Sequence, residues 1–126
     1  MAKQVHAVTT TDLGPAAADL FFSIAERLGL TVEQEATLLG VSERTAQRYQ
    51  HEGRMPESRD TIERISHVAT IWIDLTSLFR EESGALAWLH AANERFNGAS
   101  PLERMLAGNV SDLVDVRYDI EAILVA

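Results

Sequence analysis

Residues 88–108, WLHAANERFNGASPLERMLAG, carry the signals that a helical hairpin needs. Three apolar residues recur at helical spacing in and just before the first half of this stretch: Leu86, Leu89 and Phe96. Asn97-Gly98 follows, and these residue types adopt the left-handed backbone that ends a helix at little cost. The first helix is therefore expected to end at Gly98.

The second arm of this hairpin has its own start and stop signals. Ser100 can accept a hydrogen bond from a free backbone N–H, and Glu103 can reach back to the cap three residues earlier. Pro101 fits the first helical position, and Gly108 closes the helix. An exposed loop rarely carries so complete a set, so the sequence predicts a compact folded unit here.

Length and composition limit the protein class. At 126 residues the chain has the size of one domain, or of two small helical units with a shared core. The absence of cysteine excludes disulfides and thiolate metal sites. The sequence shows neither a signal peptide nor an apolar run of about 18–20 residues, so no membrane association is expected and the cytoplasm is the expected compartment.

Helical periodicity also appears in the first half of the chain. Residues 1–12 are polar and irregular, which predicts a loose arm. A helix then starts at Gly14-Pro15 and is closed by Gly29. Its apolar stripe has four members: Leu20, Phe21, Ile24 and Leu28. No segment has convincing period-two alternation, so the predicted fold class is all-α.

Two short helices with a tight turn are expected next. Thr31 and Gln34 form a capping box, and Ser42 caps a helix over about residues 43–50. A helix-turn-helix needs small and apolar residues where its helices cross, and the chain supplies them: Ala36, Leu39, Gly40, Val41, Ala46 and Tyr49. Glu35 departs from this pattern, because an apolar residue is common there. The first helix is then expected to be shifted, or its core thinner than usual.

A long helix is expected from about Ser58 to Arg80, ended by residues 81–84. Its apolar residues form two faces: Ile62, Ile65, Ala69, Trp72 and Phe79 on one, and Val68, Ile71, Leu75 and Leu78 on the other. One small core cannot use so wide a surface, so this helix bridges two units, buries a dimer interface, or does both. A last helix begins near Ser111 with one stripe: Leu113, Val116, Ile120 and Leu124.

The hairpin resembles the C-terminal module of the Xre/MbcA/ParS-type antitoxins, in which Trp-Leu, Asn-Gly and Ser-Pro-Leu-Glu elements occur in this order. The resemblance is close over residues 83–126 and looser before them. It implies an N-terminal, Xre-like DNA-binding helix-turn-helix unit over residues 1–57, a linking and dimerisation helix over 58–82, and a toxin-binding module over 83–126. The implied partners are a RES-domain toxin, which is an enzyme that consumes NAD⁺, and operator DNA.

A DNA-binding role selects polar residues on the third helix and beside it. Arg and Gln form bidentate hydrogen bonds with guanine and adenine, and the candidates for base contacts are Arg44, Gln47 and Arg48. The candidates for phosphate contacts are Ser42, Thr45, Arg54 and Arg59. Residues 43–64 hold five arginines and five acidic residues, so useful affinity is expected to require a dimer on two half-sites. A helical hairpin without a DNA role is the alternative.

The resemblance also implies where a toxin binds. In those antitoxins the last helix and tail lie over the entrance to the toxin's active site. Carried over to this chain, this selects Arg117, Tyr118, Glu121, Leu124, Val125 and Ala126. Ile123 stands where many members have a glycine, so the last helix is expected to run on without a bend. Deletion of residues 119–126 is expected to leave a folded protein. Three residues match family positions that look structural: Trp88, Pro101 and Leu102.

Catalysis has little support. The four histidines lie far apart with no i, i+4 pair, and the sequence has no phosphate-binding glycine loop, so no catalytic residue, metal or cofactor is expected. The predicted function is a non-enzymatic antitoxin that covers a RES toxin, represses its own operon and forms a homo-oligomer. The alternatives are a stand-alone dimeric helix-turn-helix transcription regulator and a small cytosolic enzyme. The acidic surface of residues 65–126 suits either a basic partner or plain solvation.

Overall fold

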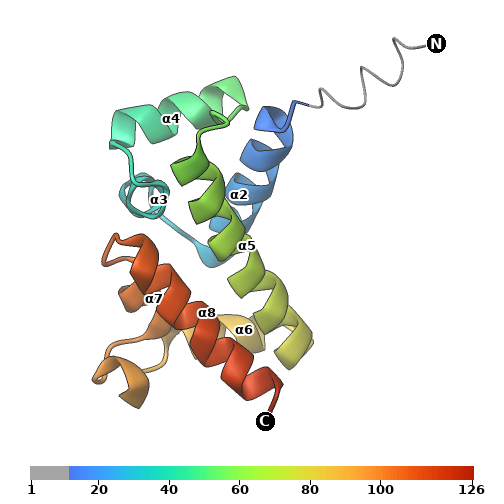
Figure 1. The fold of residues 1–126 in the computed structure, drawn as a ribbon, viewed down its shortest axis with the longest axis vertical. Helices are drawn as coiled ribbons and strands as arrows, with labels where there is room; N and C mark the ends of the chain where they lie inside the picture. The colour runs from blue at the N-terminus through green and yellow to red at the C-terminus, as the bar shows by residue number, and fades with distance from the viewer. Residues whose placement is uncertain (1–11) are drawn as a thin grey trace, which may run out of the picture.

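A computed structural model of the protein describes residues 12–126, which are helical and contain no strand. The all-α prediction is confirmed. The elements of the described part are α2 (Gly14–Leu28), α3 (Val32–Leu39), α4 (Glu43–Glu52), α5 (Arg59–Phe79), α6 (Glu82–His90), the 3₁₀ turn η1 (Glu94–Phe96), α7 (Pro101–Met105) and α8 (Val110–Leu124) (Figure 1). The loose arm expected at the N-terminus lies, except for Asp12, outside the described residues. Within residues 12–126 no helix is both long and apolar enough to cross a bilayer.

The long helix α5 joins the two halves of the molecule (Figure 1). It packs against α2 and α3 from the N-terminal half and against α6 and α8 from the C-terminal half. One continuous core results, with buried side chains from both halves that include Phe21, Leu39, Val68, Leu75, Leu89, Met105 and Ile120. Both predicted faces of α5 are used inside the chain, and the large apolar residues that stay exposed on α5 are Ile73 and Phe79.

The predicted helix starts are confirmed by their capping hydrogen bonds. The Thr31 hydroxyl accepts from the Gln34 N–H at 3.1 Å, and the Ser42 hydroxyl accepts from the Thr45 N–H at 3.1 Å. Ser100 accepts from the Glu103 N–H at 3.1 Å, and the Glu103 carboxylate accepts from the Ser100 N–H at 2.8 Å. These caps satisfy backbone donors that would otherwise be free, which fixes where each helix begins.

The helix expected to run to Gly98 ends instead at His90, so that prediction is wrong. The chain becomes extended at Ala91, and the Asn93 side chain then caps η1 by accepting from the Arg95 N–H at 2.9 Å. Asn97 does adopt the left-handed backbone, with φ of 57°, but it closes η1 rather than a helix. Phe96 is buried in the core as the last residue of η1, so its predicted burial holds although the helix around it does not.

Other element boundaries also differ from the expectation. Residues 81–84 do not simply end α5, since α6 already starts at Glu82. A Cβ on Gly84 would lie 2.9 Å from the Phe79 Cβ, so glycine permits this close approach of α6 to the end of α5. Three residues assigned to apolar stripes are exposed: Leu20, Phe79 and Leu124. Pro101 and Leu102 are buried as predicted, and Trp88 is partly buried against the core.

Candidate functional site

The turn between α3 and α4 has the geometry of a helix-turn-helix. The two helices pack against each other through four buried residues: Ala36, Leu39, Ala46 and Tyr49. Gly40 has φ of 71°, which glycine adopts without strain. A Cβ at Gly40 would also lie 2.7 Å from the Arg64 Cζ, so a larger residue would displace the Arg64 guanidinium.

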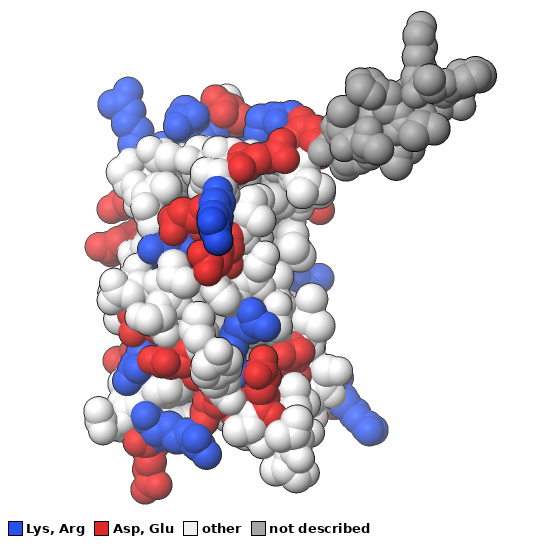
Figure 2. All heavy atoms as spheres, in the orientation of Figure 1, with Lys and Arg blue, Asp and Glu red and all other residues white. Residues whose placement is uncertain are grey.

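The polar residues predicted on α4 lie together at one end of the molecule (Figure 1). Thr45 is partly buried. The other predicted DNA contacts are exposed: Ser42, Arg44, Gln47, Arg48, Arg54 and Arg59. Arg48 lies 3.8 Å from the Glu52 carboxylate, and its guanidinium is 5.2 Å from the centre of the Tyr49 ring. Arg44 has no ion-pair partner in the part of the chain that the structure describes. Figure 2 shows basic and acidic side chains interleaved over this end.

Arg54 is already engaged by an acidic residue. Its guanidinium donates hydrogen bonds to both carboxylate oxygens of Asp12, one of them at 3.0 Å. The Gly14 N–H donates to the same carboxylate at 3.0 Å. The bonds from Arg54 first, and then from Gly14, lower the pKa of Asp12 to about 2. This bond ties the start of α2 to the loop after α4, and a phosphate contact from Arg54 would have to compete with it. The sequence analysis missed Asp12, although an Asp two residues before a helix start is a known turn signal.

The last helix presents an exposed surface to solvent at its end. Tyr118 is 64% exposed, Leu124 41% and Val125 84%. Glu121 and Ala126 are also exposed. As expected from Ile123, α8 continues to Leu124 with a right-handed backbone at Val125. The predicted toxin contacts other than Arg117 therefore lie free on one end of the protein, opposite α4 (Figure 1).

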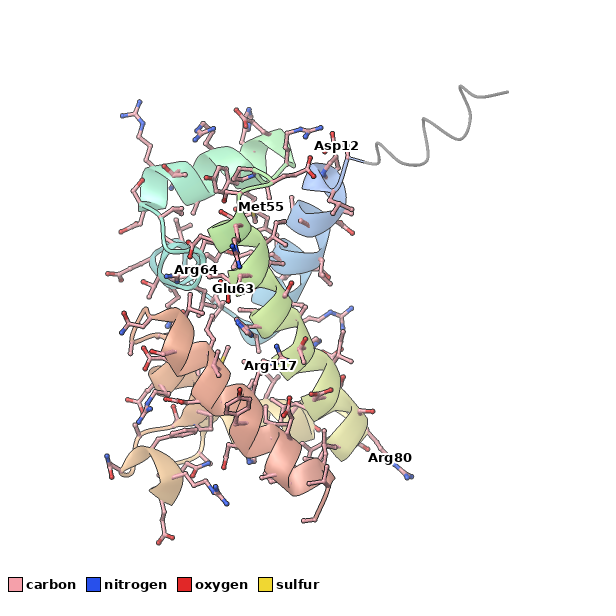
Figure 3. The ribbon with its side chains drawn as sticks, in the orientation of Figure 1. Asp12, Met55, Glu63, Arg64, Arg80 and Arg117 are labelled. Atoms are coloured by element: carbon pink, nitrogen blue, oxygen red, sulfur yellow. The ribbon has the colours of Figure 1, made fainter. Side chains whose placement is uncertain are left out.

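Arg117 points inward instead. Its Nη1 lies 3.0 Å from the His67 Nδ1 on α5, and its Nη2 lies 3.7 Å from the Glu121 carboxylate (Figure 3). Burial first, and then the charge of Arg117, lower the pKa of His67. The neutral imidazole can accept a hydrogen bond from Arg117. A contact between Arg117 and a toxin would require this bond between α5 and α8 to break.

A second charged residue of α8 has a structural role that the sequence analysis missed. Asp119 is 6% exposed, and its Oδ1 lies 2.8 Å from the Arg95 Nε. The Asn93 amide donates to its other oxygen at 3.5 Å. Asp119 therefore holds the irregular η1 segment against α8. Asp119 and Ile120 are both buried, so deletion of residues 119–126 removes part of the core, which argues against the expectation that this deletion leaves the fold intact.

Arg64 links the two halves at the point where their turns meet. Its side chain is 12% exposed, and its Nη1 donates to the Leu38 carbonyl at 3.3 Å and the Gly108 carbonyl at 3.2 Å. Its Nε donates to the Asp60 carboxylate at 3.1 Å. Figure 3 shows Arg64 on the first half of α5, facing the junction with α3 and α8. One guanidinium thus joins the helix-turn-helix to the turn before the last helix.

Within residues 12–126 no group of three or more His, Cys, Asp or Glu side chains is placed to hold a metal ion. The described part of the chain thus has two candidate binding surfaces: the helix-turn-helix at one end, and the exposed terminal helix of the C-terminal module at the other.

Comparison with known families identifies both parts. Residues 8–69 match the antitoxin Xre-like helix-turn-helix domain, and residues 74–123 match the antitoxin Xre/MbcA/ParS C-terminal toxin-binding domain. The chain is 38% identical over 110 residues to the uncharacterized protein y4oB of Sinorhizobium fredii strain NGR234, a match that covers 86% of this chain and 84% of that protein. The protein belongs to the Xre/MbcA/ParS-type antitoxins. The two matched regions meet inside α5.

Proposed function

We propose that this antitoxin neutralises a RES-domain, NAD⁺-consuming toxin by covering its active site, and that it binds operator DNA to repress its own operon. The observation that carries the proposal is the placement of its two surfaces. The polar face of α4 and the exposed end of α8 lie at opposite ends of one continuous core (Figure 1). A DNA duplex and a toxin are therefore able to bind at the same time without competing for the same surface.

The end of α8 supports a covering role through its apolar and aromatic residues. Tyr118, Leu124 and Val125 are mostly or partly exposed, and they contribute little to the core of this chain. Burial of one such side chain contributes about 1.5–3 kcal/mol, so three of them would supply much of the energy of a specific contact. Glu121 lies on the same helix and offers a polar contact. We propose that Arg117 acts mainly by holding α8 against α5.

The face of α4 supports sequence reading by Arg44, Gln47 and Arg48, with Ser42 and Thr45 beside the phosphates. Interleaved acidic residues weaken the attraction to phosphate, so we propose that two copies bind two half-sites as a homo-oligomer. Most of the apolar surface of α5 is used inside the chain, which leaves Ile73 and Phe79 for a contact between copies.

We propose that the protein acts by binding alone and is not an enzyme. A stand-alone transcription regulator would also explain the exposed face of α4. It would give no purpose to the exposed end of α8, which lies in the region that matches a toxin-binding domain. The three-part division at residues 57 and 82 remains a proposal, because the core runs through all three parts.

The test is co-expression with a RES-domain toxin encoded beside the antitoxin, with cellular NAD⁺ as the measurement. The full-length chain is expected to hold NAD⁺ at the level of cells without toxin. A chain that lacks residues 122–126 keeps the buried Asp119 and Ile120, so it is expected to fold but to protect poorly. An Arg44→Ala variant is the matched control and is expected to protect fully. Loss of NAD⁺ in the presence of the full-length chain would contradict the proposal.

A further inference from the structure

A hollow between α2, α3 and the end of α4 is lined by Glu35, whose carboxyl group the proposed function does not use. The hollow has a volume of about 870 Å³ and is open to solvent. Glu35 of α3 lines it and is only 7% exposed. The neighbouring Ala36 and Leu39 are 3% and 0% exposed, so Glu35 occupies a core position of the helix-turn-helix. The sequence suggested a shifted helix or a thin core here, and α3 starts where its capping box predicts, so the helix is not shifted.

The carboxyl of Glu35 lacks a partner among residues 12–126. Its side chain takes part in no hydrogen bond or ion pair there, and burial is the one cause that raises the pKa of Glu35. Partial loss of hydration of a carboxylate, without a partner in its place, destabilises a folded chain. An acidic residue that breaks the helix-turn-helix pattern without a compensating bond inside the protein is typical of a binding position.

The other residues of the hollow indicate what it can bind. Asp19 and Glu26 of α2 add two exposed carboxylates, and the lining contains no Lys or Arg. Phe22, Leu30 and Val32 provide a partly buried apolar floor. Phosphate would be repelled here, and no group of three or more potential ligands is placed for a metal ion in the described residues. Lys and Arg side chains combine an aliphatic stem with a cationic head, which matches an apolar floor beneath carboxylates.

We propose that this hollow is a docking site for a Lys or Arg side chain of a basic partner protein, with the Glu35 carboxylate as the anion that pairs with it. The net charge of the chain is −8, which disfavours a second copy and favours a basic protein as the source of that side chain. The site lies outside the residues that match the toxin-binding domain. Gln50 and Gly53 also line it, so the partner would sit beside the C-terminal end of α4. The inference requires neither the toxin nor the operator.

The test uses ¹⁵N-labelled full-length protein and capped tripeptides followed by NMR. The peptide Leu-Arg-Leu is expected to shift the amides of Phe22, Val32 and Gly53 in a saturable way, with a Kd on the order of 1 mM, as for a small fragment. The neutral peptide Leu-citrulline-Leu has the same shape, and at least a tenfold weaker affinity is expected. Gly-Arg-Gly, which lacks the apolar flanks, is expected to bind severalfold more weakly than Leu-Arg-Leu.

Two variants test whether the binding depends on the Glu35 carboxylate. Glu35→Gln keeps the shape and removes the charge without loss of the fold, and it is expected to weaken Leu-Arg-Leu binding at least tenfold. Glu33→Gln removes an exposed charge from the same helix and is expected to leave the affinity within twofold. Equal binding by Glu35→Gln, or no saturable shift at 10 mM peptide, would overturn the proposal. Shifts of the same amides with protein concentration alone would overturn it in favour of a second copy, and tighter binding of spermidine would overturn it in favour of a small polyamine.

Discussion

The two ends of the molecule use charged side chains in different ways. At the α4 end the helix is held by a Ser42 cap and by buried Ala46 and Tyr49, so Arg44 is left free of ion pairs within residues 12–126. In the C-terminal module three arginines contact other elements of the same chain: Arg95, Arg104 and Arg117. Arg104 lies 3.0 Å from the Asp115 carboxylate and 4.9 Å from the centre of the Phe96 ring.

This difference follows from how each end satisfies its backbone. The helix-turn-helix consists of capped helices and one tight glycine turn, so local hydrogen bonds satisfy most of its backbone, and the Leu38 carbonyl accepts one further bond from Arg64. The C-terminal module contains the irregular stretch 91–100, which depends on contacts from Asp119 on α8. In this module the charged residues therefore stabilise contacts between elements of the chain. The residues that stay exposed at the end of α8 are mostly apolar.

The largest effect is expected from a change in the core that the two ends share. Leu75 on α5 is 0% exposed, and Leu75→Ala is expected to lower the free energy of unfolding by about 2–5 kcal/mol. Chemical denaturation, followed by helical circular dichroism and by Trp fluorescence, is the measurement. Coincident transitions would show that the two ends unfold as one unit. Separate transitions, with only one of them shifted, would mean that the ends are independent. Ser77→Ala on the exposed side of α5 is the control, with an expected change below about 1 kcal/mol.

Local features of this fold were predictable from the sequence, and long-range ones were not. The caps at Thr31, Ser42 and Ser100 depend on residues within three positions, so their helix starts were predicted correctly. The inward turn of Arg117 depends on His67, which lies fifty positions earlier in the chain. The irregular segment that follows α6 likewise depends on Asn93, which donates to Asp119 on α8, 26 positions later.

The candidate site divides in the same way. Exposure of Arg44, Gln47 and Arg48 followed from helical periodicity alone. The pairing of Arg54 with Asp12 did not, because 42 residues separate the two. The sequence marked Glu35 as unusual, but the hollow around it appears only when residues of α2, α3 and α4 come together in the fold. Local chemistry thus selects candidate residues, and distant contacts decide which of them are free to bind.

The next effect concerns the link between the two ends. Arg64→Met keeps most of the aliphatic stem and removes the hydrogen bonds to the Leu38 and Gly108 carbonyls. The expected loss of unfolding free energy is about 2–3 kcal/mol, because bonds from a charged donor are stronger than neutral ones. Hydrogen exchange is expected to rise at both turns. Faster exchange at one turn alone would show that Arg64 does not join the ends. Arg59→Met, at the exposed start of the same helix, is the control.

The affinity for operator DNA is expected to depend on Arg44 of α4 more than on an arginine elsewhere in the protein. Arg44→Ala is expected to weaken specific binding to the promoter upstream of the gene by about 1–3 kcal/mol, the value of one bidentate contact with guanine. Arg80→Asn, at the far end of α5, removes the same charge and suits the left-handed backbone there (Figure 3). Titration by fluorescence anisotropy at fixed salt is the measurement. Equal losses in the two variants would indicate that net charge, rather than base reading, sets the affinity.

The smallest expected effect is a gain in stability when Glu35, the acidic residue buried in the helix-turn-helix, is replaced by Gln. Burial raises the pKa of Glu35 above its ordinary value of 4.5, so the folded state holds this proton more tightly than the unfolded state. Above the folded pKa the carboxylate is ionised in both states, and the folded state alone bears the burial penalty. As the pH falls through the folded pKa the penalty shrinks, and below 4.5 it is absent. Glu35→Gln is therefore expected to stabilise the protein by about 1 kcal/mol at pH 7 and to lose that advantage at pH 4. Urea denaturation at both pH values measures it, with Glu33→Gln as the exposed control. A Gln variant less stable than the original at pH 7 would mean that the carboxylate has a stabilising partner, and the hollow would then need no external cation.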